Sequence, residues 1–573
     1  MIEITRADKQ YLIAKVYGSG ADFKQSLRPI KYDLPVRSWN ASSKCWLFPL
    51  RDLAKLINIC NKQKVEFKCA PSVIKAYKDL LSHTKLLKSV TDGDPLWYSM
   101  DLLKLPLRNF QEIGAKFSYE SGNDIIGDMV GLGKTPQALA ISQKCFDEGE
   151  INFVIIICSS TLKRNWYPEL EKFTHWKYCI IEGDKSKRRT TYKRAKKFDA
   201  LILNYEILMW DWDLIKEFII NSHFMFHLIL DEIQYIKNNK AKRSKYTKKL
   251  AESARRVTGL TATPYENTPT DLWSIFHPID TTVYGGQRTF SRFEERYIAQ
   301  DYWGTATGAR NLTELRKRKS PSFIRRLKEE VLDELPDKIE SDYWVELSRE
   351  QRQIYNDIKN KIVTEIQDQE KAEKIKMAEV LPMMIYLRMA VQSASLLTHK
   401  RGESTKLNQL VDLITDTGDI KLVVFCFFTG MIDMIGDTLT GLGVGNIAIH
   451  GKNTKPDERV AKVNKFNNDK DIKVLATSDI LREGVNATSA NYLVNFDILF
   501  NPAKMEQRVG RIDRMGNENA TINIINFIGV DTVEEEVYAI YSGKKKISTE
   551  VIDDGKIENR LTMKSIKSLL ELK

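Results

Sequence analysis

Short apolar runs alternate with amphipathic segments of helical length along most of this chain. A first series of apolar runs covers 153–158, 200–203, 228–230 and 257–260, and a second covers 422–427, 447–449, 472–475 and 492–494. Strands that are apolar throughout and separated by helices are typical of parallel sheets buried on both faces. The pattern therefore predicts an α/β fold with two parallel-sheet lobes.

The chain of 573 residues is too long for one hydrophobic core and suggests about three or four domains. Between the lobes, long charged stretches such as 350–379 have helical periodicity and few strand signals. The expected domains are a small N-terminal accessory module at 1–85, the first lobe at 86–280, helical insertions and a linker at 281–400, the second lobe at 401–545 and a C-terminal helical tail at 546–573.

A glycine-rich segment between an apolar run at 124–126 and a helical run at 137–142 has the features of a phosphate-binding loop. Its glycines allow backbone N–H groups to close around phosphate oxygens, and the positive end of the next helix adds to the attraction. Lys134 would neutralise the β- and γ-phosphates, and the Thr135 hydroxyl would bind magnesium. Asp128 replaces the first glycine of the strict GxxxxGKT motif, which leaves the shorter GxGKT form of helicase-like motors. The expected nucleotide-binding residues of the loop are Asp128, Met129, Val130, Gly131, Leu132, Gly133, Lys134 and Thr135.

Two adjacent carboxylates, Asp231 and Glu232, follow the buried run 228–230, about a hundred residues after the loop. Ligands of α/β sheets bind at the carboxyl ends of the strands, so this pair belongs to the same candidate site. Asp231 would hold magnesium, and Glu232 would orient and deprotonate the attacking water. An isolated Asp-Glu pair is usually surface charge, and only its position on a buried strand gives it this meaning.

Two further segments have side chains suited to a nucleotide. The amide of Gln111 offers both a donor and an acceptor to the edge of adenine, although a capping or surface glutamine is the alternative interpretation. In the second lobe, Arg511 and Arg514 are three residues apart, which would place them on one face of a helix. They are suited to stabilising charge on a γ-phosphate, and Gln507 on the same segment is assigned to the catalytic set with them. Because they come from the other lobe, hydrolysis would require the lobes to close.

Charge and cysteine content limit the partners and the compartment. Lys plus Arg outnumber Asp plus Glu by 88 to 76, and basic residues are dense at 185–197, 240–249 and 316–319. This favours a polyanionic partner, with a solvated basic surface as the alternative. The seven cysteines are scattered without a CxxC spacing, which indicates a reduced compartment and no zinc site. Since no run approaches 18 apolar residues, we expect a soluble protein without membrane contact.

Taken in order, these motifs resemble those of the SWI/SNF-like family of superfamily-two helicase-related ATPases, which translocate on double-stranded DNA. The segments that carry the resemblance, besides the loop and the acidic pair, are 158–169, 237–238, 260–264 with Asn267, 325–328, 335–338, 484–486 and 500–502. The match runs from about residue 100 to 530. It implies two RecA-like lobes, ATP and magnesium as cofactors, and a monomeric motor that binds double-stranded DNA.

The resemblance also implies DNA contacts and a location. The DNA-binding residues that it suggests are Ser160, Lys163, Asn165, Trp166, Thr261, Thr263, Gly451, Thr477 and Asn486. The expected location is the cytoplasm of a bacterial or phage-infected cell, associated with the nucleoid, or the nucleus of a eukaryote.

Two finer resemblances favour different activities. Phe23, Ile30-Lys31, Trp39-Asn40 and 44–49 look like the HARP module of annealing helicases, which bind branched DNA and rewind it. The alternative is a small β-rich domain that uses its tryptophans as core. By contrast, 501–516 is similar to RapA-type RNA polymerase recyclers, although we expect the chain to be too short for their flanking domains. A strand-separating helicase and an ATP-switched DNA clamp are the remaining alternatives.

The chain departs from the family pattern at three places. Gln234 stands where the family usually has histidine, and a neutral amide still forms hydrogen bonds. Leu481-Arg482 replaces two glycines, which puts a close backbone approach to DNA in doubt. Met129-Val130 replaces the usual Glu-Met, and no physical reason explains that change.

Overall fold

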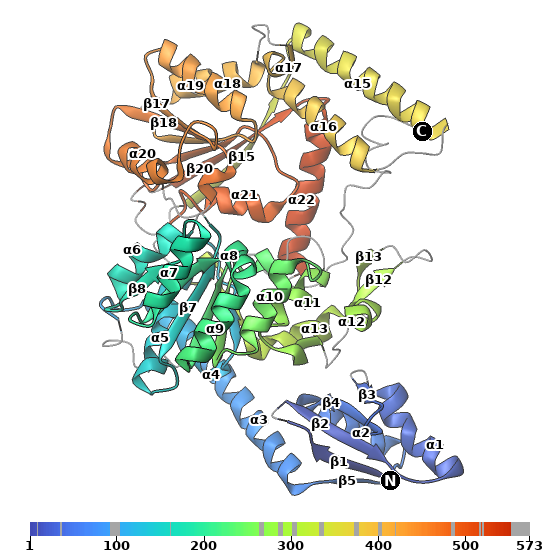
Figure 1. Ribbon diagram of the computed structural model, residues 1–573. Helices are drawn as coiled ribbons and strands as arrows, with labels where there is room; N and C mark the ends of the chain where they lie inside the picture. Colours follow the sequence, from blue (N-terminus) through green and yellow to red (C-terminus); the bar gives the residue numbers. More distant parts are fainter. Residues whose placement is uncertain are drawn as a thin grey trace. The chain divides into compact units, whose positions relative to one another are not determined.

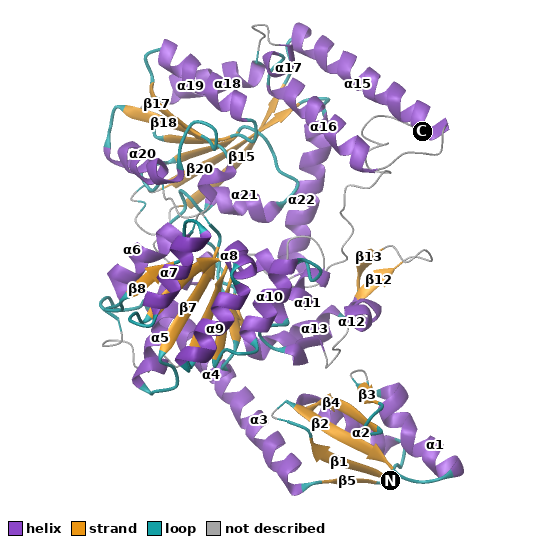
Figure 2. Cartoon of the chain, viewed as in Figure 1, coloured by secondary structure: helices purple, strands orange, loops and turns teal. Residues whose placement is uncertain are grey.

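The computed structural model consists of two compact units, Met1–Leu327 and Lys328–Lys573 (Figure 1). Helices flank the strands of the two α/β lobes (Figure 2). The residues that the structure describes are 1–8, 10–34, 37–91, 103–160, 162–262, 269–284, 290–300, 306–331, 337–371, 377–398, 404–418, 420–482, 487–514, 517, 519 and 521–551.

The first unit begins with a small module built on a mixed sheet with the strand order β3-β4-β2-β1-β5. Its elements are β1 (Ile2–Arg6), β2 (Tyr11–Val16), α1 (Gly20–Arg28), η1 (Pro29–Asp33), β3 (Ser38–Asn40), β4 (Cys45–Pro49), η2 (Leu50–Asp52), α2 (Leu53–Lys62) and β5 (Phe67–Cys69). Ile4, Leu12 and Phe48 are fully buried in its core. Trp46 packs partly on this core, whereas its cross-strand partner Trp39 is 47% exposed. The interpretation of both tryptophans as core is therefore wrong for Trp39.

Helix α3 (Pro71–Thr91) continues without a break from the module into the first lobe. Leu87 and Val90 are buried in the core of the lobe, together with Ala115 and Phe117 of α4 (Asn109–Ser121). The domain boundary expected at residue 85 therefore lies inside α3. The sequence around residue 85 has no proline or glycine that would end a helix there.

The first lobe has a parallel sheet whose seven described strands follow the order β14-β6-β11-β10-β7-β9-β8. The strands are β6 (Asp124–Ile126), β7 (Phe153–Cys158), β8 (Tyr178–Ile180), β9 (Ala200–Asn204), β10 (Phe226–Asp231), β11 (Arg256–Leu260) and β14 (Phe323–Ile324). The helices are α4, α5 (Lys134–Asp147), α6 (Lys163–Phe173), α7 (Lys185–Ala195), α8 (Tyr205–Trp210), α9 (Trp212–Ser222), η3 (Ile233–Ile236), α10 (Lys242–Ala251), α11 (Pro269–Phe276) and η4 (Thr281–Tyr284).

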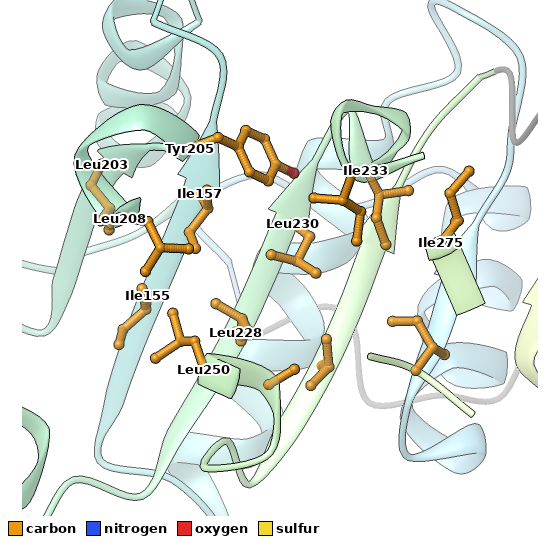
Figure 3. Packing of buried hydrophobic residues seen from close by; sticks show 14 of the residues in the cluster. Ile155, Ile157, Leu203, Tyr205, Leu208, Leu228, Leu230, Ile233, Leu250 and Ile275 are labelled. Carbon is orange, nitrogen blue, oxygen red and sulfur yellow. The ribbon is translucent and has the colours of Figure 1, made fainter. Parts of the chain in front are cut away.

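Apolar side chains cover both faces of this sheet. Ile155 and Leu228 lie on one face and pack with Leu208 and Leu250 (Figure 3). The alternating residues Val154, Ile156 and Ile229 lie on the other face and pack with Leu139 and Trp166. The uniformly apolar runs in the sequence arise from this two-sided burial, as predicted.

The sequence predicts helical insertions and a linker at 281–400, but the structure also has strands in this region. It contains α12 (Phe290–Tyr297), β12 (Ile298–Gln300), β13 (Ala306–Ala309), α13 (Leu312–Lys319), η5 (Ser320–Ser322), β14, α14 (Lys328–Val331), β15 (Asp337–Val345), α15 (Arg349–Lys371), α16 (Met377–Gln392) and α17 (Ser395–Thr398). Strand β14 joins the sheet of the first lobe, and β15 joins the sheet of the second. Both are edge strands, and edge strands lack the continuous apolar run that identifies a central strand.

The second unit has a parallel sheet whose described strands follow the order β15-β20-β19-β16-β18-β17. The remaining elements are α18 (Thr405–Thr417), β16 (Leu422–Phe425), α19 (Thr429–Gly441), β17 (Gly445–Ile449), α20 (Pro456–Asn468), β18 (Ile472–Thr477), η6 (Asp479–Arg482), β19 (Tyr492–Asn495), α21 (Pro502–Val509), β20 (Thr521–Gly529) and α22 (Val533–Val551). The two α/β lobes predicted from the sequence are thus confirmed. Among the described helices, none has both the length and the hydropathy needed to cross a membrane.

A buried ion pair fixes α22 to the second sheet. Lys406 Nζ lies 2.6 Å from the Glu534 carboxylate, and their side chains are 0% and 1% exposed. Lys406 also donates to the carbonyl oxygens of Phe496 and Phe527 at 2.9 and 3.1 Å. Such a pair costs desolvation energy, and the loss of one partner costs more because the other charge stays buried.

We expect Lys406→Met to lower the free energy of unfolding by about 3–5 kcal/mol, because Glu534 would keep an uncompensated buried charge. The double variant Lys406→Met with Glu534→Gln should recover most of that loss. The measurement is denaturant unfolding followed by circular dichroism, with Arg28→Met in the exposed pair with Asp33 as control. A single variant as stable as this control would contradict the expectation.

Candidate nucleotide-binding site

Three adjacent strands of the first lobe end in one row. Asp231 of β10 pairs with Leu260 of β11, and Leu260 pairs with Ile126 of β6. The glycine-rich loop after β6, the segment after β11 and the acidic pair after β10 therefore leave the sheet at the same edge. Parallel α/β sheets bind their ligands at this edge.

The glycine-rich loop closes onto the amino end of α5. Gly131 and Gly133 have φ values of 92° and 71°, in the left-handed region, and Gly133 is the N-cap of α5. A Cβ atom at Gly133 would lie 2.3 Å from Gln111 Nε2, so only glycine fits there. Lys134 Nζ donates to the carbonyl oxygens of Asp128 and Met129 at 2.8 and 3.3 Å. The Lys134 ammonium thus lies against the loop, and its binding to phosphate stays a prediction.

The side chain of Asp128 points into the protein and not toward a nucleotide. It is fully buried, and its carboxylate accepts hydrogen bonds from Arg326 Nε at 3.0 Å and from Gln137 Nε2 at 3.0 Å. This side chain is therefore engaged within the protein, and a nucleotide contact through the backbone of Asp128 stays a prediction. Its carboxylate instead anchors the loop, a role that no local motif indicates.

Gln111 lies against the loop, as expected, but both ends of its amide already have partners. Its Oε1 accepts from the backbone N–H of Arg108 at 3.0 Å, and its Nε2 donates to the carbonyl of Leu132 at 3.1 Å. The capping role considered in the sequence is thus present. Since an amide oxygen accepts twice and an amide nitrogen donates twice, adenine recognition stays a prediction.

The acidic pair is partly buried, and the backbone of Glu232 is strained. Trp166 Nε1 donates to Asp231 Oδ2 at 2.8 Å, and the backbone N–H of Glu232 donates to Asp231 Oδ1 at 3.0 Å. Burial, together with the neighbouring charge of Glu232, raises the pKa of Asp231 to about 7, although the Trp166 hydrogen bond and Lys134 oppose the rise. Glu232 has φ 48°, a conformation that costs on the order of 1–3 kcal/mol and is common at functional sites.

This group of side chains fits a hard divalent cation. Thr135 and Asp231 supply oxygen atoms, the ligand type that magnesium prefers. Burial disfavours a charged Asp231, and a bound cation would reverse that preference. Gln234, where the family usually has histidine, donates from Nε2 to the Glu232 carboxylate and is 7% exposed. The amide therefore orients Glu232 within this site.

Three of the residues assigned to DNA have buried side chains. Trp166 is 2% exposed, and Thr261 and Thr477 are fully buried. Thr477 Oγ1 hydrogen-bonds to the carbonyls of Ile449 and Ser478, both at 3.1 Å. These side chains offer almost no exposed surface to DNA, because residue type alone does not show which way a side chain faces, and a contact through their backbone stays a prediction.

The other candidates for DNA contact stay predictions. Ser160 and Gly451 are exposed just beyond the carboxyl ends of β7 and β17. Lys163 is half-buried, and its Nζ donates to the carbonyl of Ile181 at 3.4 Å. Thr263, Asn486 and the side chain of Asn165 lie outside the described part of the chain.

The arginine segment of the second unit is not one continuous helix. Helix α21 ends at Val509, and residues 510–514 form turns, so Arg511 and Arg514 do not share a helical face. Arg511 is 6% exposed, and Arg514 and Gln507 are half-buried.

Arg508 anchors this segment and was not singled out from the sequence. Its fully buried guanidinium pairs with Asp479 at 2.8 Å and with Asp497 at 3.1 Å. Burial lowers the pKa of Arg508, but the two carboxylates outweigh it and the net shift is upward. Because the partners are 29 and 11 residues away, a search for local motifs misses this cluster.

Comparison with known proteins identifies the family. The SNF2-related domain matches residues 40–396, and the helicase conserved C-terminal domain matches residues 405–516. The chain belongs to the SNF2-related family. The family resemblance drawn from the motifs is thus confirmed, whereas these matches leave the HARP-like assignment of the N-terminal module untested.

Among curated SNF2-related relatives, an uncharacterized ATP-dependent helicase of Mycoplasma pneumoniae is 28% identical over 476 residues, covering 81% of this chain and 44% of that protein. The TATA-binding protein-associated factor mot1 of Schizosaccharomyces pombe is 27% identical, covering 78% and 26%. The chain thus spans less than half of these relatives. Among solved structures, a Sulfolobus solfataricus SWI2/SNF2 ATPase core in complex with dsDNA is 24% identical, with a TM-score of 0.38, covering 82% of this chain and 98% of that one.

In this SNF2-related site, we expect Trp166→Phe to raise the magnesium concentration for half-maximal ATP turnover about tenfold. The variant removes one hydrogen bond to a charged carboxylate, worth about 1.5–3 kcal/mol, and the proton then competes better with the cation. The matched control is Trp176→Phe, since Trp176 donates instead to Gln143 at 2.7 Å. Equal magnesium dependence in both variants would refute the role of Trp166.

Proposed function

We propose that the chain is an ATP hydrolase whose turnover drives movement along double-stranded DNA. The main observation is that the phosphate loop leaves β6 and the pair Asp231-Glu232 leaves β10 at the same edge of the sheet, with β11 between the two strands. A site for nucleoside triphosphate hydrolysis needs a phosphate cradle beside a carboxylate that activates water. Family membership and the names of the relatives as ATP-dependent helicases support this proposal.

Each residue has a separate role in the proposed reaction. The backbone of the loop and Lys134 bind the β- and γ-phosphates. Thr135 and Asp231 would hold magnesium, which neutralises phosphate charge when bound. Glu232 orients the attacking water and accepts its proton. Gln234 holds the Glu232 carboxylate in place for this step.

Arg511 and Arg514 complete the proposed mechanism. Charge that develops on the γ-phosphate needs cationic donors, and arginines suit this role. Because they belong to the second unit, we propose that hydrolysis follows closure of the two lobes. Closure would couple each turnover to a step along DNA.

The proposal that DNA is the polyanion rests on surface charge as well as on the family. Helix α7 carries Lys185, Lys187 and Arg189 exposed on its surface. Such clusters attract a phosphate backbone irrespective of sequence, and binding of that kind weakens with salt. A relative from Mus musculus, 26% identical, is named a chromodomain-helicase-DNA-binding protein.

A preference for branched DNA is the second candidate function, and the N-terminal module supports it. Trp39 is nearly half exposed, and Tyr32 is 64% exposed with the Lys31 ammonium 5.2 Å from its ring centroid. Exposed aromatic and cationic side chains suit unpaired bases at a junction.

We expect Lys134→Ala and Glu232→Gln both to abolish ATP turnover but to differ in nucleotide binding. Lys134 neutralises phosphate charge, so its loss should weaken ATP binding, whereas Glu232 acts on water and its loss should leave ATP bound. The measurement is titration with a fluorescent ATP analogue alongside turnover. Similar affinities in the two variants would contradict the assigned roles.

We expect duplex DNA to stimulate ATP turnover, and Trp39→Ala to remove any preference for forked over linear duplex while leaving stimulation by linear duplex intact. Deletion of the module is a poor test, because truncation at residue 85 cuts α3 and removes Asp52, which pairs with the buried Arg318 at 2.8 Å. Trp210→Ala is the control, since Trp210 of the first lobe is 63% exposed.

The measurement is the ATPase rate with linear duplex, forked DNA, single-stranded DNA and RNA. Stimulation by RNA alone would overturn the DNA proposal, and an unchanged fork preference in Trp39→Ala would overturn the role of the module. Strand separation in a duplex-unwinding assay would favour the helicase alternative. Stimulation of ATP turnover by RNA polymerase would favour the RapA-type alternative. Stable DNA binding without displacement of a third strand from triplex DNA would favour the clamp, because a clamp does not move along the duplex.

A further inference from the structure

The chain segment that connects the two units forms backbone hydrogen bonds with the first residues of the phosphate loop. After β14 pairs with β6, the carbonyl of Ile324 accepts from the Gly127 N–H at 2.7 Å. The carbonyl of Arg326 then accepts from the Met129 N–H at 3.2 Å. The first residues of the loop are thus paired with the connecting segment, as though the strand continued.

Two arginines of this segment hold the loop with their side chains as well. Arg325 Nη1 donates to the carbonyl of Ala262 at 2.8 Å and to that of Gly127 at 3.4 Å. Arg326 is an ion-pair partner of the fully buried Asp128, to which its Nε donates at 3.0 Å. The space around this pair is tight, because a Cβ atom at Gly114 would lie 2.3 Å from Arg326 Nη2.

The same segment is anchored again, in the second unit, by Lys328. Lys328 Nζ lies 2.8 Å from the Asp513 carboxylate, and both side chains are 3% exposed. Asp513 lies between Arg511 and Arg514, the two arginines assigned to the γ-phosphate. Only Leu327 separates this second anchor from Arg326, and the boundary between the units falls directly after it.

We propose that Arg326 and Lys328 are positioning residues for ATP hydrolysis, which together tie the phosphate loop of the first unit to the arginine turn of the second. This inference rests on the proposed function. Arg326 fixes the loop through Asp128, and Lys328 fixes the turn through Asp513. The short tie limits how far Arg511 and Arg514 can be placed from the loop when the lobes close, so neither anchor needs to touch the nucleotide.

The physical reason for a short tie is that the reaction depends on distance. A misplacement of about 1 Å at a reacting group costs about a hundredfold in rate. One additional residue between the two anchors lengthens the extended chain by about 3.3–3.6 Å. Such a change leaves each ion pair intact within its own unit and alters only the connection between them.

The test is a variant with one glycine inserted between Leu327 and Lys328. The matched control has one glycine inserted after Gly443, in an exposed turn where a Cβ atom would meet nothing within 4 Å. We expect the insertion at 327 to lower turnover about a hundredfold, with unchanged affinity for ATP and for duplex DNA. The control should hydrolyse ATP as the unmodified chain does. Equal turnover in the two insertion variants would overturn the proposal.

A second pair of variants decides the matter if the insertion at 327 also lowers the unfolding temperature or the affinity for ATP. Lys328→Ala removes the closer of two ion pairs of Asp513 and leaves the more exposed Lys338 at 3.6 Å, whereas Lys328→Arg preserves the charge. Low turnover with normal ATP affinity in the alanine variant, restored in the arginine variant, supports the proposal. Turnover of the alanine variant equal to that of the unmodified chain overturns it. Failure of the proposed function is a separate result, because the unmodified chain would then show no ATP turnover at all.

Discussion

The register of the parallel strands in the first lobe is the constraint on which the candidate site depends. All strands of a parallel sheet present their carboxyl ends at one edge, and the pairing of Asp231 with Leu260 and of Leu260 with Ile126 aligns three of those ends. A shift of one residue in the register of a strand would move each of its side chains to the opposite face of the sheet. Burial of both faces resists such a shift, because apolar residues such as Ile155 and Val154 pack on opposite sides. Hydrophobic packing of the strands thereby places the phosphate loop and the acidic pair at one edge of the sheet.

Buried charges then set the finer geometry of the loops, which the sheet alone cannot do. The pairs Arg326 with Asp128 and Arg508 with Asp497 are both formed between side chains that are largely removed from water. Burial of two charges is costly, and well-packed apolar residues in their place are often as stable. These ion pairs therefore contribute a fixed orientation of the side chains more than stability, because a guanidinium binds carboxylate oxygens in only a few orientations. Such pairs hold a loop in one conformation.

The phosphate loop, the acidic pair and the two lobes could be predicted because each depends on neighbouring residues in the sequence. Lys134 and Thr135 follow closely spaced glycines, and a continuous apolar run precedes Asp231. The Asp128–Arg326 pair spans 198 positions, and nothing in a single sequence connects two such residues. The position of Trp166 could not be predicted for a related reason. Its aromatic ring suits DNA or a core equally well, and only the fold shows its hydrogen bond to Asp231.

The acidic pair shows how the fold supports a site that is unfavourable by itself. Glu232 has a left-handed backbone, and Asp231 has a carboxyl group whose charged form is disfavoured by burial. Both costs fall on residues at the end of a strand buried among apolar neighbours, whose packing offsets them. A divalent cation favours the charged form of Asp231 and so relieves part of the cost when it binds. Because the pKa of Asp231 is raised to about 7, protons compete with that cation below neutral pH, and the site is most receptive to it above.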